Sequence, residues 1–519
     1  MNDKQTGSFY TPKRLVKYMS EYAMNRCNAS AVLEPSVGDG RFIDMLKQYN
    51  CRIDAVELDG SKIEKLCRKK EDRVRLINDN FINYALDSTE KYDLIIGNPP
   101  YITKKMLSEE DRILSLELIK YWSLPESIFQ NLWVSFVLGA VKLLDDNTGA
   151  IFFVLPFEFL QVHYAEKLRR FLEDRFNSIE IITFKESVFS DIEQDVCLVY
   201  LTNCSGQEPI VRYTTVKSVR NFRPIEYSEI KRNKPLSKWS NSILSDDEIE
   251  LLKNLSSKYT KVSSLGSISP GIVTGANNFF ILKKSDVDKM GCQESVIPII
   301  QKSSIVGNML VCTEDDQEKL LNSDKNALML NLNGVNSSSF SAELEAYILN
   351  GEKDNLNTRY KCRQRKRWYD VPIISSGNLM FFKRYNKLPR IIVNEPGIFT
   401  TDIAYNIRLS DDFEAKSVAF CFYNSLTIAL CEYNGRFYGG GVGELVPSEF
   451  KSLSIPYKKI DEEKIQILDY MLRENASIDE ILRYVDNIVL DYLDSHELDK
   501  LKKIREKYLI RRLKVNGQK

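Results

Sequence analysis

The sequence predicts an α/β protein: a mixed sheet covered by helices, followed by an α+β domain that ends in helices. Short apolar runs alternate with segments of helical periodicity between residues 31 and 201, a pattern typical of strands linked by helices. The chain has 519 residues, which is too many for one hydrophobic core. After Cys204 the alternation stops, so we predict a first domain at residues 1–240 and a second at residues 241–519.

The composition is that of a globular protein, with 43% hydrophobic and 28% charged residues. Lysine plus arginine and aspartate plus glutamate each number 72, so a surface that binds nucleic acid has to be local. The ten cysteines form no C-x-x-C pair and there are only two histidines, so we expect no metal site, disulfide or histidine catalysis. Residues 1–7 are polar and the apolar helix predicted at residues 132–144 is too short to span a bilayer, which indicates a cytoplasmic protein.

The first helix is expected to begin at Pro12, because Leu15, Val16 and Met19 recur at helical spacing after it. Thr11 suits the N-cap position and proline suits the first helical position. The N–H groups of this helix end would face an anion such as a carboxylate.

Two strands with polar ends follow. The first, residues 31–33, ends at Glu34 and is followed by a loop that contains Gly38 and Gly40. Glycine removes the Cβ atom where a ligand approaches the backbone closely, and the loop lacks the Lys-Ser/Thr pair of a phosphate-binding P-loop. The second strand, residues 53–56, ends at Glu57, where an acid accepts hydrogen bonds from the ribose hydroxyls of an adenosine-containing cofactor.

The third and fourth strands also end in candidate site residues. Residues 74–77 are followed by a polar acceptor for an adenine amino group and a ring to pack on it, in the run Asn78, Asp79, Asn80 and Phe81. Residues 94–96 stop at Gly97 and are followed by Asn98, Pro99, Pro100 and Tyr101. Because ligands bind at the carboxyl ends of parallel strands, we expect these loops to form one site.

The segment from Asn98 to Tyr101 suits methyl transfer to an exocyclic amino group, whose lone pair is delocalised into its ring. The Asn98 side-chain oxygen and the Pro99 carbonyl would hold the two N–H bonds out of plane and stabilise the charge that develops on nitrogen. Tyr101 would stack on the base, which is worth roughly 1–3 kcal/mol. The alternative is an ordinary Pro-Pro turn after a core strand.

The order of these features resembles that of gamma-class N6-adenine DNA methyltransferases, the group that includes TaqI-like enzymes. The resemblance rests on Thr11-Pro12, the loop from Glu34 to Gly40, Glu57, and the run from Asn98 to Tyr101. It implies a Rossmann-like, seven-stranded class I methyltransferase domain, S-adenosylmethionine as cofactor and an adenine flipped out of double-stranded DNA. It also implies catalytic roles for Asn98, Pro99 and Tyr101, and cofactor contacts from Thr11, Glu34, Gly38, Gly40, Glu57, Asp79, Asn80, Phe81, Asn98 and Pro100.

Some assignments within this resemblance stay open. The family has an acid where this chain has Asn80, with Asp79 beside it, so either residue is a candidate for the cofactor's adenine. Phe189 lies in a segment that resembles the loop stacking on the flipped base, and the alternative is that Phe189 is a core phenylalanine.

Strands at 151–155, 179–183 and 197–201, with a helix near 164–172, would complete seven strands. Residues 102–130 are predicted to be a solvated connector or a DNA-contacting insertion, and residues 206–238 a linker or a strand-rich bridge.

The second domain contains two segments that point to DNA. Residues 270–280 resemble the entry to the TaqI-like target-recognition domain. Residues 359–367 hold six basic side chains, and we predict that Arg363, Arg365, Lys366 and Arg367 contact DNA; the alternative is a solvated face. The glycine-rich residues 436–443 resemble a loop of the same domain or form an ordinary turn. From about residue 458 the apolar spacing predicts helices.

Two other functions are compatible with part of this pattern. Methylation of a protein glutamine or an RNA base would use the same residues, but the large second domain disfavours it. A catalytically inactive DNA-specificity protein is disfavoured by intact Glu57 and Asn98. We expect a nucleoid-associated monomer that acts beside a companion restriction endonuclease or as an orphan modification enzyme.

Overall fold

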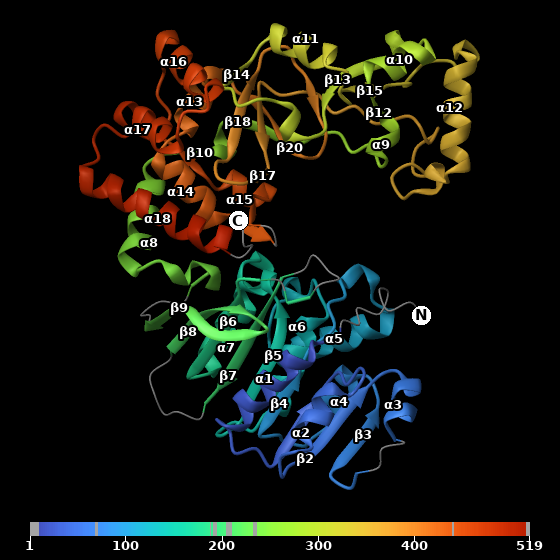
Figure 1. Cartoon of the computed structure of the whole chain (residues 1–519), viewed down its shortest axis with the longest axis vertical. Helices are drawn as coiled ribbons and strands as arrows, with labels where there is room; N and C mark the ends of the chain where they lie inside the picture. The colour runs from blue at the N-terminus through green and yellow to red at the C-terminus, as the bar shows by residue number, and fades with distance from the viewer. Residues whose placement is uncertain are drawn as a thin grey trace. The chain divides into compact units, whose positions relative to one another are not determined.

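A computed structural model describes residues 10–67, 71–186, 188–189, 195–203, 210–231, 236–438 and 441–514 (Figure 1). The chain divides into two compact units. The first unit comprises Met1–Asp246 with two short returning segments, Tyr438–Gly441 and Ile510–Lys519. The second unit comprises Asp247–Phe437 and Val442–Leu509.

The first unit is built on a nine-stranded mixed sheet in the order β3-β2-β1-β4-β5-β7-β6-β8-β9. Its first five strands are parallel, and β7 runs antiparallel to both β5 and β6. The strands are β1 (Ala31–Glu34), β2 (Arg52–Glu57), β3 (Val74–Asn78), β4 (Leu94–Gly97), β5 (Ala150–Pro156), β6 (Ser178–Phe184), β7 (Val196–Thr202), β8 (Ile210–Ser218) and β9 (Asn221–Lys231).

Seven of these strands are the predicted ones, and β8 and β9 are additional. The segment predicted as a linker or a strand-rich bridge contains both strands, and β8 pairs with β6 in parallel while β9 pairs with β8 antiparallel. The predicted count of seven strands therefore needs correction to nine in this sheet. Prolines within the segment favoured a linker, yet β9 is the last strand of the sheet order, and an edge strand tolerates Pro224.

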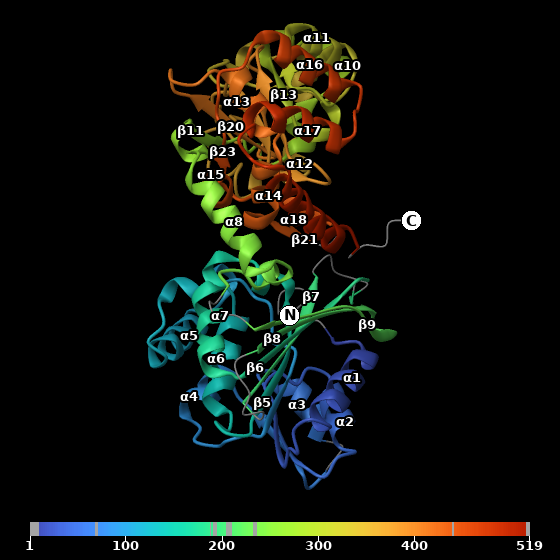
Figure 2. The same cartoon turned by 90° about the vertical axis from the view of Figure 1, so that its left-hand side faces the viewer.

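Helices cover both faces of the sheet. Figure 2 shows α1 (Lys13–Met24), α2 (Arg41–Leu46) and α3 (Gly60–Cys67) on one face. On the other face lie α4 (Phe81–Asp87), α5 (Glu109–Tyr121), α6 (Trp133–Leu143) and α7 (Glu166–Arg175). Ten of the eleven residues of α6 are buried, which accounts for its apolar sequence without a membrane. No helix in the described ranges is long and apolar enough to cross a bilayer.

The start of α1 differs from the prediction by one residue. The helix begins at Lys13, and Pro12 occupies the N-cap position with φ −55° and ψ 134°, which is not a helical conformation. Thr11 therefore lies outside the helix and does not cap it. Instead its carbonyl accepts a hydrogen bond of 2.7 Å from Arg41 Nη1. This contact brings the segment before α1 to the start of α2.

The second unit contains several small sheets. The two larger ones have the strand orders β11-β20-β16-β18-β14 and β12-β15-β13-β19. Its strands are β10 (Thr260–Lys261), β11 (Gly266–Pro270), β12 (Ile281–Leu282), β13 (Val296–Ile300), β14 (Val311–Cys312), β15 (Leu328–Leu330), β16 (Leu379–Phe382), β17 (Arg384–Tyr385), β18 (Arg390–Asn394), β19 (Phe399–Thr400), β20 (Ala404–Leu409), β21 (Arg436–Tyr438), β22 (Val442–Glu444) and β23 (Ser454–Ile455).

Among the described residues, α-helices accompany these strands. They are α8 (Asp246–Ser257), α9 (Asn277–Phe280), α10 (Lys284–Met290), α11 (Glu314–Asn322), α12 (Ala342–Lys353), α13 (Ala415–Phe422), α14 (Ser425–Asn434), α15 (Pro447–Lys451), α16 (Glu462–Arg473), α17 (Ile478–Val489) and α18 (Ser495–Lys514). The last of them, α18, ends in the segment Ile510–Lys519 of the first unit. The segment predicted to be helical from about residue 458 contains the last three. Residues 439–440 of the glycine-rich segment lie outside the described residues.

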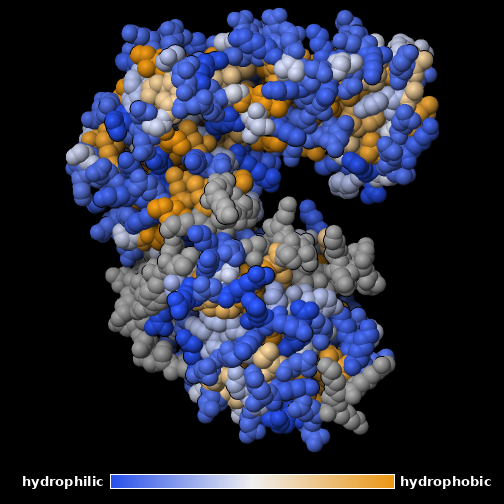
Figure 3. All heavy atoms as spheres, in the orientation of Figure 1, coloured by the Kyte–Doolittle hydropathy of each residue, from blue (hydrophilic) through white to orange (hydrophobic). Residues whose placement is uncertain are grey.

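A core cluster in the second unit joins α9, α12 and the loop that follows α12. It includes Phe279 and Phe280 from α9, Leu344 and Ile348 from α12, and Trp368 from the loop. Most of the visible surface is hydrophilic, but hydrophobic residues reach it in the part that holds α9 and α12 (Figure 3). There Val273 is 40% exposed and Leu349 is 55% exposed.

Candidate active site

The loops after β1 and β2 are joined by a carboxylate. Gly38 and Gly40 adopt left-handed conformations, with φ +59° and +82°, which L-residues with side chains rarely take. A Cβ on Gly40 would also lie 2.6 Å from Leu66 Cδ2. The Gly38 N–H donates to Glu57 Oε2 at 2.9 Å, so the glycine loop and the acid at the end of β2 hold one another in place.

Glu57 is half-buried and keeps acceptor capacity. Its Oε1 accepts from the Asp59 N–H at 3.0 Å, and Lys62 Nζ lies 3.8 Å away. Each carboxylate oxygen has two lone pairs, so the two backbone N–H groups leave room for further donors. Leu58 follows directly and is 68% exposed. Leu58 was not among the predicted site residues, although an apolar residue placed immediately after the acid at a strand end is a usable signal.

Glu34, at the end of β1, is a buried carboxyl with an unused oxygen. Its side chain is 1% exposed, and within the described part of the chain nothing donates to Oε2. Burial raises the pKa of Glu34 well above its usual range, and the nearby Asp39 and Glu57 carboxylates raise it further. A hydrogen bond from the Ile43 backbone opposes this change. A donor group placed beside the glycine loop would satisfy the buried oxygen.

The loop after β3 separates the two adenine candidates. Asn80 Oδ1 accepts from the Ile82 N–H at 2.9 Å as the N-cap of α4, and its Nδ2 donates to Asp111 Oδ1 at 2.8 Å. Both ends of the Asn80 amide are therefore engaged. Asp79 Oδ1 accepts from the Asn80 N–H at 2.7 Å, whereas within the described ranges its Oδ2 receives only a long 3.3 Å contact from Asn83 Nδ2. Of the two candidates, Asp79 has the more available acceptor.

Phe81, predicted to pack on the cofactor's adenine, lies in the core below this loop. It is 3% exposed, and its ring lies 4.8 Å from that of Phe136. Gly139 makes room for it, because a Cβ at that position would lie 2.9 Å from the Phe81 ring.

The loop after β4 presents the proposed catalytic residues. Ser36 Oγ donates to the Asn98 carbonyl at 3.1 Å, which links this loop to the one after β1. The Tyr101 hydroxyl lies 3.0 Å from both Asn98 Oδ1 and the Val154 carbonyl. Burial raises the pKa of Tyr101 well above its usual range, so the phenol is neutral. Pro99 is buried and Pro100 half-buried, and among the described residues no N–H or hydroxyl donates to the Pro99 carbonyl.

Phe189 lies in the hydrophobic core of the first unit. It is 8% exposed and belongs to a cluster that includes Phe184, Val188 and Val216. Tyr101 packs against the same cluster. Ser187 and Ser190, which flank the predicted base-stacking segment, lie outside the described residues. The buried position corresponds to the alternative of a core phenylalanine, and a role in base stacking stays a prediction.

The basic run of the second unit divides into internal and exposed cations. Arg365 Nη2 donates to the Thr274 and Val273 carbonyls at 2.7 and 3.1 Å. Arg367 donates to Asp370 at 2.8 and 2.9 Å, and to the Val335 and Leu332 carbonyls at 2.7 Å each. Arg363 and Lys366 are exposed. Arg363 and Lys366 are therefore the better candidates for DNA contacts, which stay a prediction for all four residues.

Two family models match this chain. The Eco57I restriction-modification methylase matches residues 20–189, and the C-terminal domain of the Type II methyltransferase M.Eco57I matches residues 236–490. The Type II methyltransferase M.AccI of Acinetobacter calcoaceticus is 23% identical over 94% of each chain. M.HincII of Haemophilus influenzae, also a Type II methyltransferase, is 34% identical over 37% of this chain and 36% of its own. The chain belongs with the Type II restriction–modification DNA methyltransferases.

A solved structure resembles this chain in fold. The DrdV–DNA complex superposes with a TM-score of 0.51 at 13% identity, covering 92% of this chain and 58% of that one. At this identity the likeness concerns the fold alone. The family assignment itself rests on the matches in sequence, which cover both units of the methyltransferase.

Proposed function

We propose that the chain transfers a methyl group from S-adenosylmethionine to the N6 amino group of an adenine flipped out of double-stranded DNA. The observation that carries this proposal is the placement of Asn98 and Pro99 directly after β4, beside the glycine loop after β1. One loop offers two acceptors for an amino group and the other a surface for a cofactor. The family supports DNA as the substrate.

The residues at the strand ends fit S-adenosylmethionine, which when bound supplies an activated methyl group. The unused Glu34 oxygen suits the amino group of its methionine part, which is a cationic donor. Glu57 would accept from the ribose hydroxyls, and Asp79 from the adenine amino group. Leu58 offers exposed apolar surface for the adenine ring. The left-handed glycines let the backbone approach the ligand closely.

Asn98 and Pro99 would accept the two N–H bonds of the target amino group. Fixed acceptors of this kind stabilise the positive charge that develops on nitrogen during transfer, and they need no reorganisation. The target base has to leave the duplex to reach them, at a cost of a few kcal/mol. Tyr101 stacking would offset part of this cost, with Phe189 as a second aromatic at the same core cluster.

In the second unit, Arg363 and Lys366 would contact DNA. Both are exposed cations in a loop next to exposed Tyr360, and Arg363 lies 5.7 Å from its ring. Contacts to phosphates position a protein on the duplex without reading its sequence. Relatives named as restriction–modification methylases support a place in such a system, with or without a companion endonuclease.

The deciding experiment incubates purified protein with duplex DNA and isotopically labelled S-adenosylmethionine, without added metal, and identifies the product nucleoside by mass spectrometry. We expect N6-methyladenine. Finding only N4-methylcytosine, or finding activity on an RNA or a glutamine-containing protein instead of DNA, would replace the proposed substrate. Cofactor binding without any transfer would favour a DNA-specificity protein that has lost catalysis.

A further inference from the structure

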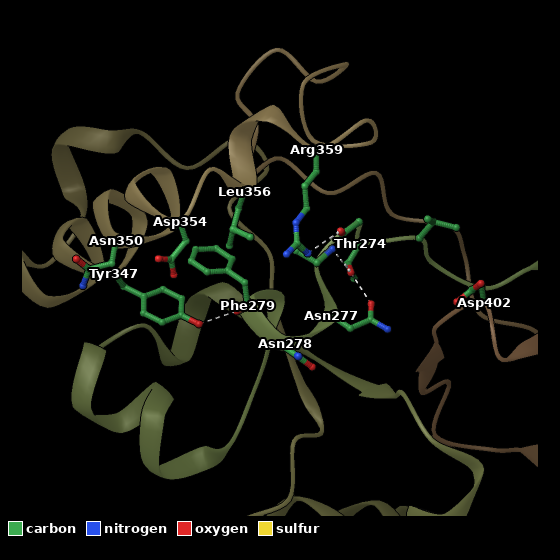
Figure 4. A pocket seen from close by; sticks show the side chains of 14 residues that line it. Thr274, Asn277, Asn278, Phe279, Tyr347, Asn350, Asp354, Leu356, Arg359 and Asp402 are labelled. Carbon is green, nitrogen blue, oxygen red and sulfur yellow. Dashed lines mark hydrogen bonds between the residues drawn. The ribbon is translucent and has the colours of Figure 1, made fainter. Parts of the chain in front are cut away.

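The second unit holds a cavity of about 940 Å³, and none of the predicted catalytic, cofactor-binding or DNA-contacting residues lines it. Its walls are the turn at residues 273–279, one side of α12 with the loop that follows it, and Asp402 (Figure 4). Arg359 comes from that loop and points toward Thr274, beside which Asn277 lies (Figure 4). The cavity is open and its lining mixes donors with acceptors.

Several contacts hold the turn in place. Arg365 Nη2 donates to the Val273 and Thr274 carbonyls at 3.1 and 2.7 Å. The Tyr347 hydroxyl donates to the Phe279 carbonyl at 2.8 Å, and the two rings stack at 4.5 Å. Gly275 has φ +81°, and a Cβ there would lie 3.0 Å from Lys361 Cβ, so the loop packs directly on the turn. A wall fixed in this way can present polar groups in one geometry.

Two donors face the cavity, Asn277 from this turn and Arg359 from the loop after α12. Thr274 Oγ1 accepts from the Ala276 N–H at 3.1 Å and donates to Asn277 Oδ1 at 2.5 Å. This relay leaves Asn277 Nδ2 as a donor, without an acceptor among the described residues. Arg359 is exposed, and the one hydrogen bond that its side chain makes in the same ranges is a long 3.5 Å contact from Nη1 to the Gly275 carbonyl. Most of its N–H groups are therefore available.

Two carboxylates line the same cavity. Asp354 is exposed and forms no ion pair within the described part of the chain, whereas Asp402 lies 3.6 Å from Lys383 Nζ. Like charge disfavours a phosphate in this cavity. A base-pair edge fits better, because the major-groove edge of a G·C pair offers two acceptors on guanine and one donor on cytosine.

We propose that this cavity reads a G·C pair of duplex DNA through the major groove. Arg359 contacts guanine O6 and N7, which is the commonest specific contact of arginine with DNA, and Asp354 accepts from cytosine N4. Asn277 Nδ2 supports the guanine contact. This inference rests on the proposed function, because it takes the substrate to be double-stranded DNA.

The test selects randomised duplexes by binding to the purified full-length protein and sequences the bound fraction. Wild type is expected to enrich a motif with a guanine at one position. Arg359→Ala should lose discrimination at that position by about 10- to 100-fold, and Arg359→Gln should shift the preference there toward adenine. Asp354→Ala should weaken selection of the same base pair. Lys353→Ala, an exposed cation at the end of α12 outside the cavity lining, serves as the control and should leave the motif unchanged.

Thermal unfolding of each variant identifies any that fail to fold. If Arg359→Ala is one of them, the base preferences of Arg359→Gln and Asp354→Ala test the proposal. The inference is overturned if the folded variants keep the wild-type motif, or if Arg359→Ala only makes the salt dependence of binding shallower, as loss of a phosphate contact does. It is also overturned if wild type enriches no motif. The selection needs no methyl transfer, so the two proposals can fail separately. If wild type selects the guanine but leaves DNA unmethylated, the proposed function is disproved and the inference about the cavity stands.

Discussion

Sequence motifs mark both the strand-end loops of the first unit and the basic loop of the second unit, but they predict the positions of the side chains better in the first. In the first unit, Gly38, Glu57 and Asn98 come from separate motifs, and hydrogen bonds join their loops at one edge of the sheet. In the second unit, six basic residues fall within nine positions, yet Arg365 and Arg367 point their donors inward while Arg363 stays exposed.

The difference lies in what fixes each side chain. At the end of a parallel strand, the backbone sets where the next residues lie, so chain order carries the geometry. In an irregular loop, a cation turns inward where buried backbone carbonyls need a hydrogen-bond donor. Proximity in sequence says nothing about that choice. Motifs at strand ends are therefore better predictors of where side chains lie than clusters of like charge.

The largest expected effect tests the first region. Asn98→Ala should lower the rate of methyl transfer by at least about 100-fold, since it removes one preorganised acceptor, while the dissociation constant of the cofactor changes much less. Single-turnover kinetics and calorimetric titration separate the two quantities. Asn147→Ala, in an exposed turn, is the control for loss of an asparagine. If the rate of the Asn98→Ala variant stays within about threefold of wild type, Asn98 does not have the proposed catalytic role.

Glu57→Ala should show the opposite result, with a larger effect on cofactor affinity than on the rate of methyl transfer. Losing hydrogen bonds to a charged acceptor, at roughly 1.5–3 kcal/mol, corresponds to about 10- to 100-fold weaker cofactor binding. The rate at saturating cofactor should fall less. Glu64→Ala removes an exposed acid from α3 and should leave the affinity unchanged. If Glu57→Ala binds the cofactor as wild type does, the acid supports only the Gly38 loop.

The second region is tested first through stability. Arg367→Ala should lower the free energy of unfolding of the second unit by about 2 kcal/mol, because four hydrogen bonds to Asp370 and two backbone carbonyls are lost. Chemical denaturation measures this change. Arg363→Ala is the matched variant, and it should differ from wild type by less than about 0.5 kcal/mol. Equal stability of the two variants would mean that both cations are solvated.

The sequence predicted most of the first region and less of the second. Gly38, Gly40 and Glu57 lie where the motif spacing placed them, because their roles depend on backbone conformation and chain order. The predicted helix start at Pro12, with Thr11 as its N-cap, was wrong by one residue. Both residues suit the positions around a helix start, and only the ψ of Pro12 distinguishes them.

Other features depend on tertiary packing, which local sequence does not encode. Phe81 and Phe189 are buried, and an aromatic residue in a loop motif gives no sign of whether its ring faces a ligand or the core. Asn80 is engaged by Asp111, a residue 31 positions away. Arg359 was one of six cations in the run, and only the cavity distinguishes it from the others.

The smallest effect decides whether the exposed cations of the basic loop meet DNA. Removing one phosphate contact should weaken binding to all sequences alike and make the slope of log affinity against log salt shallower by about one. We expect this of both Arg363→Ala and Lys366→Ala. The control, Lys289→Ala, removes an exposed cation from α10 and changes net charge equally, so it separates a direct contact from a general loss of charge. Affinities for a cognate and a scrambled duplex at several salt concentrations give both slopes. If the two variants and the control share the wild-type slope, the exposed cations of this loop are solvated and the DNA path lies elsewhere.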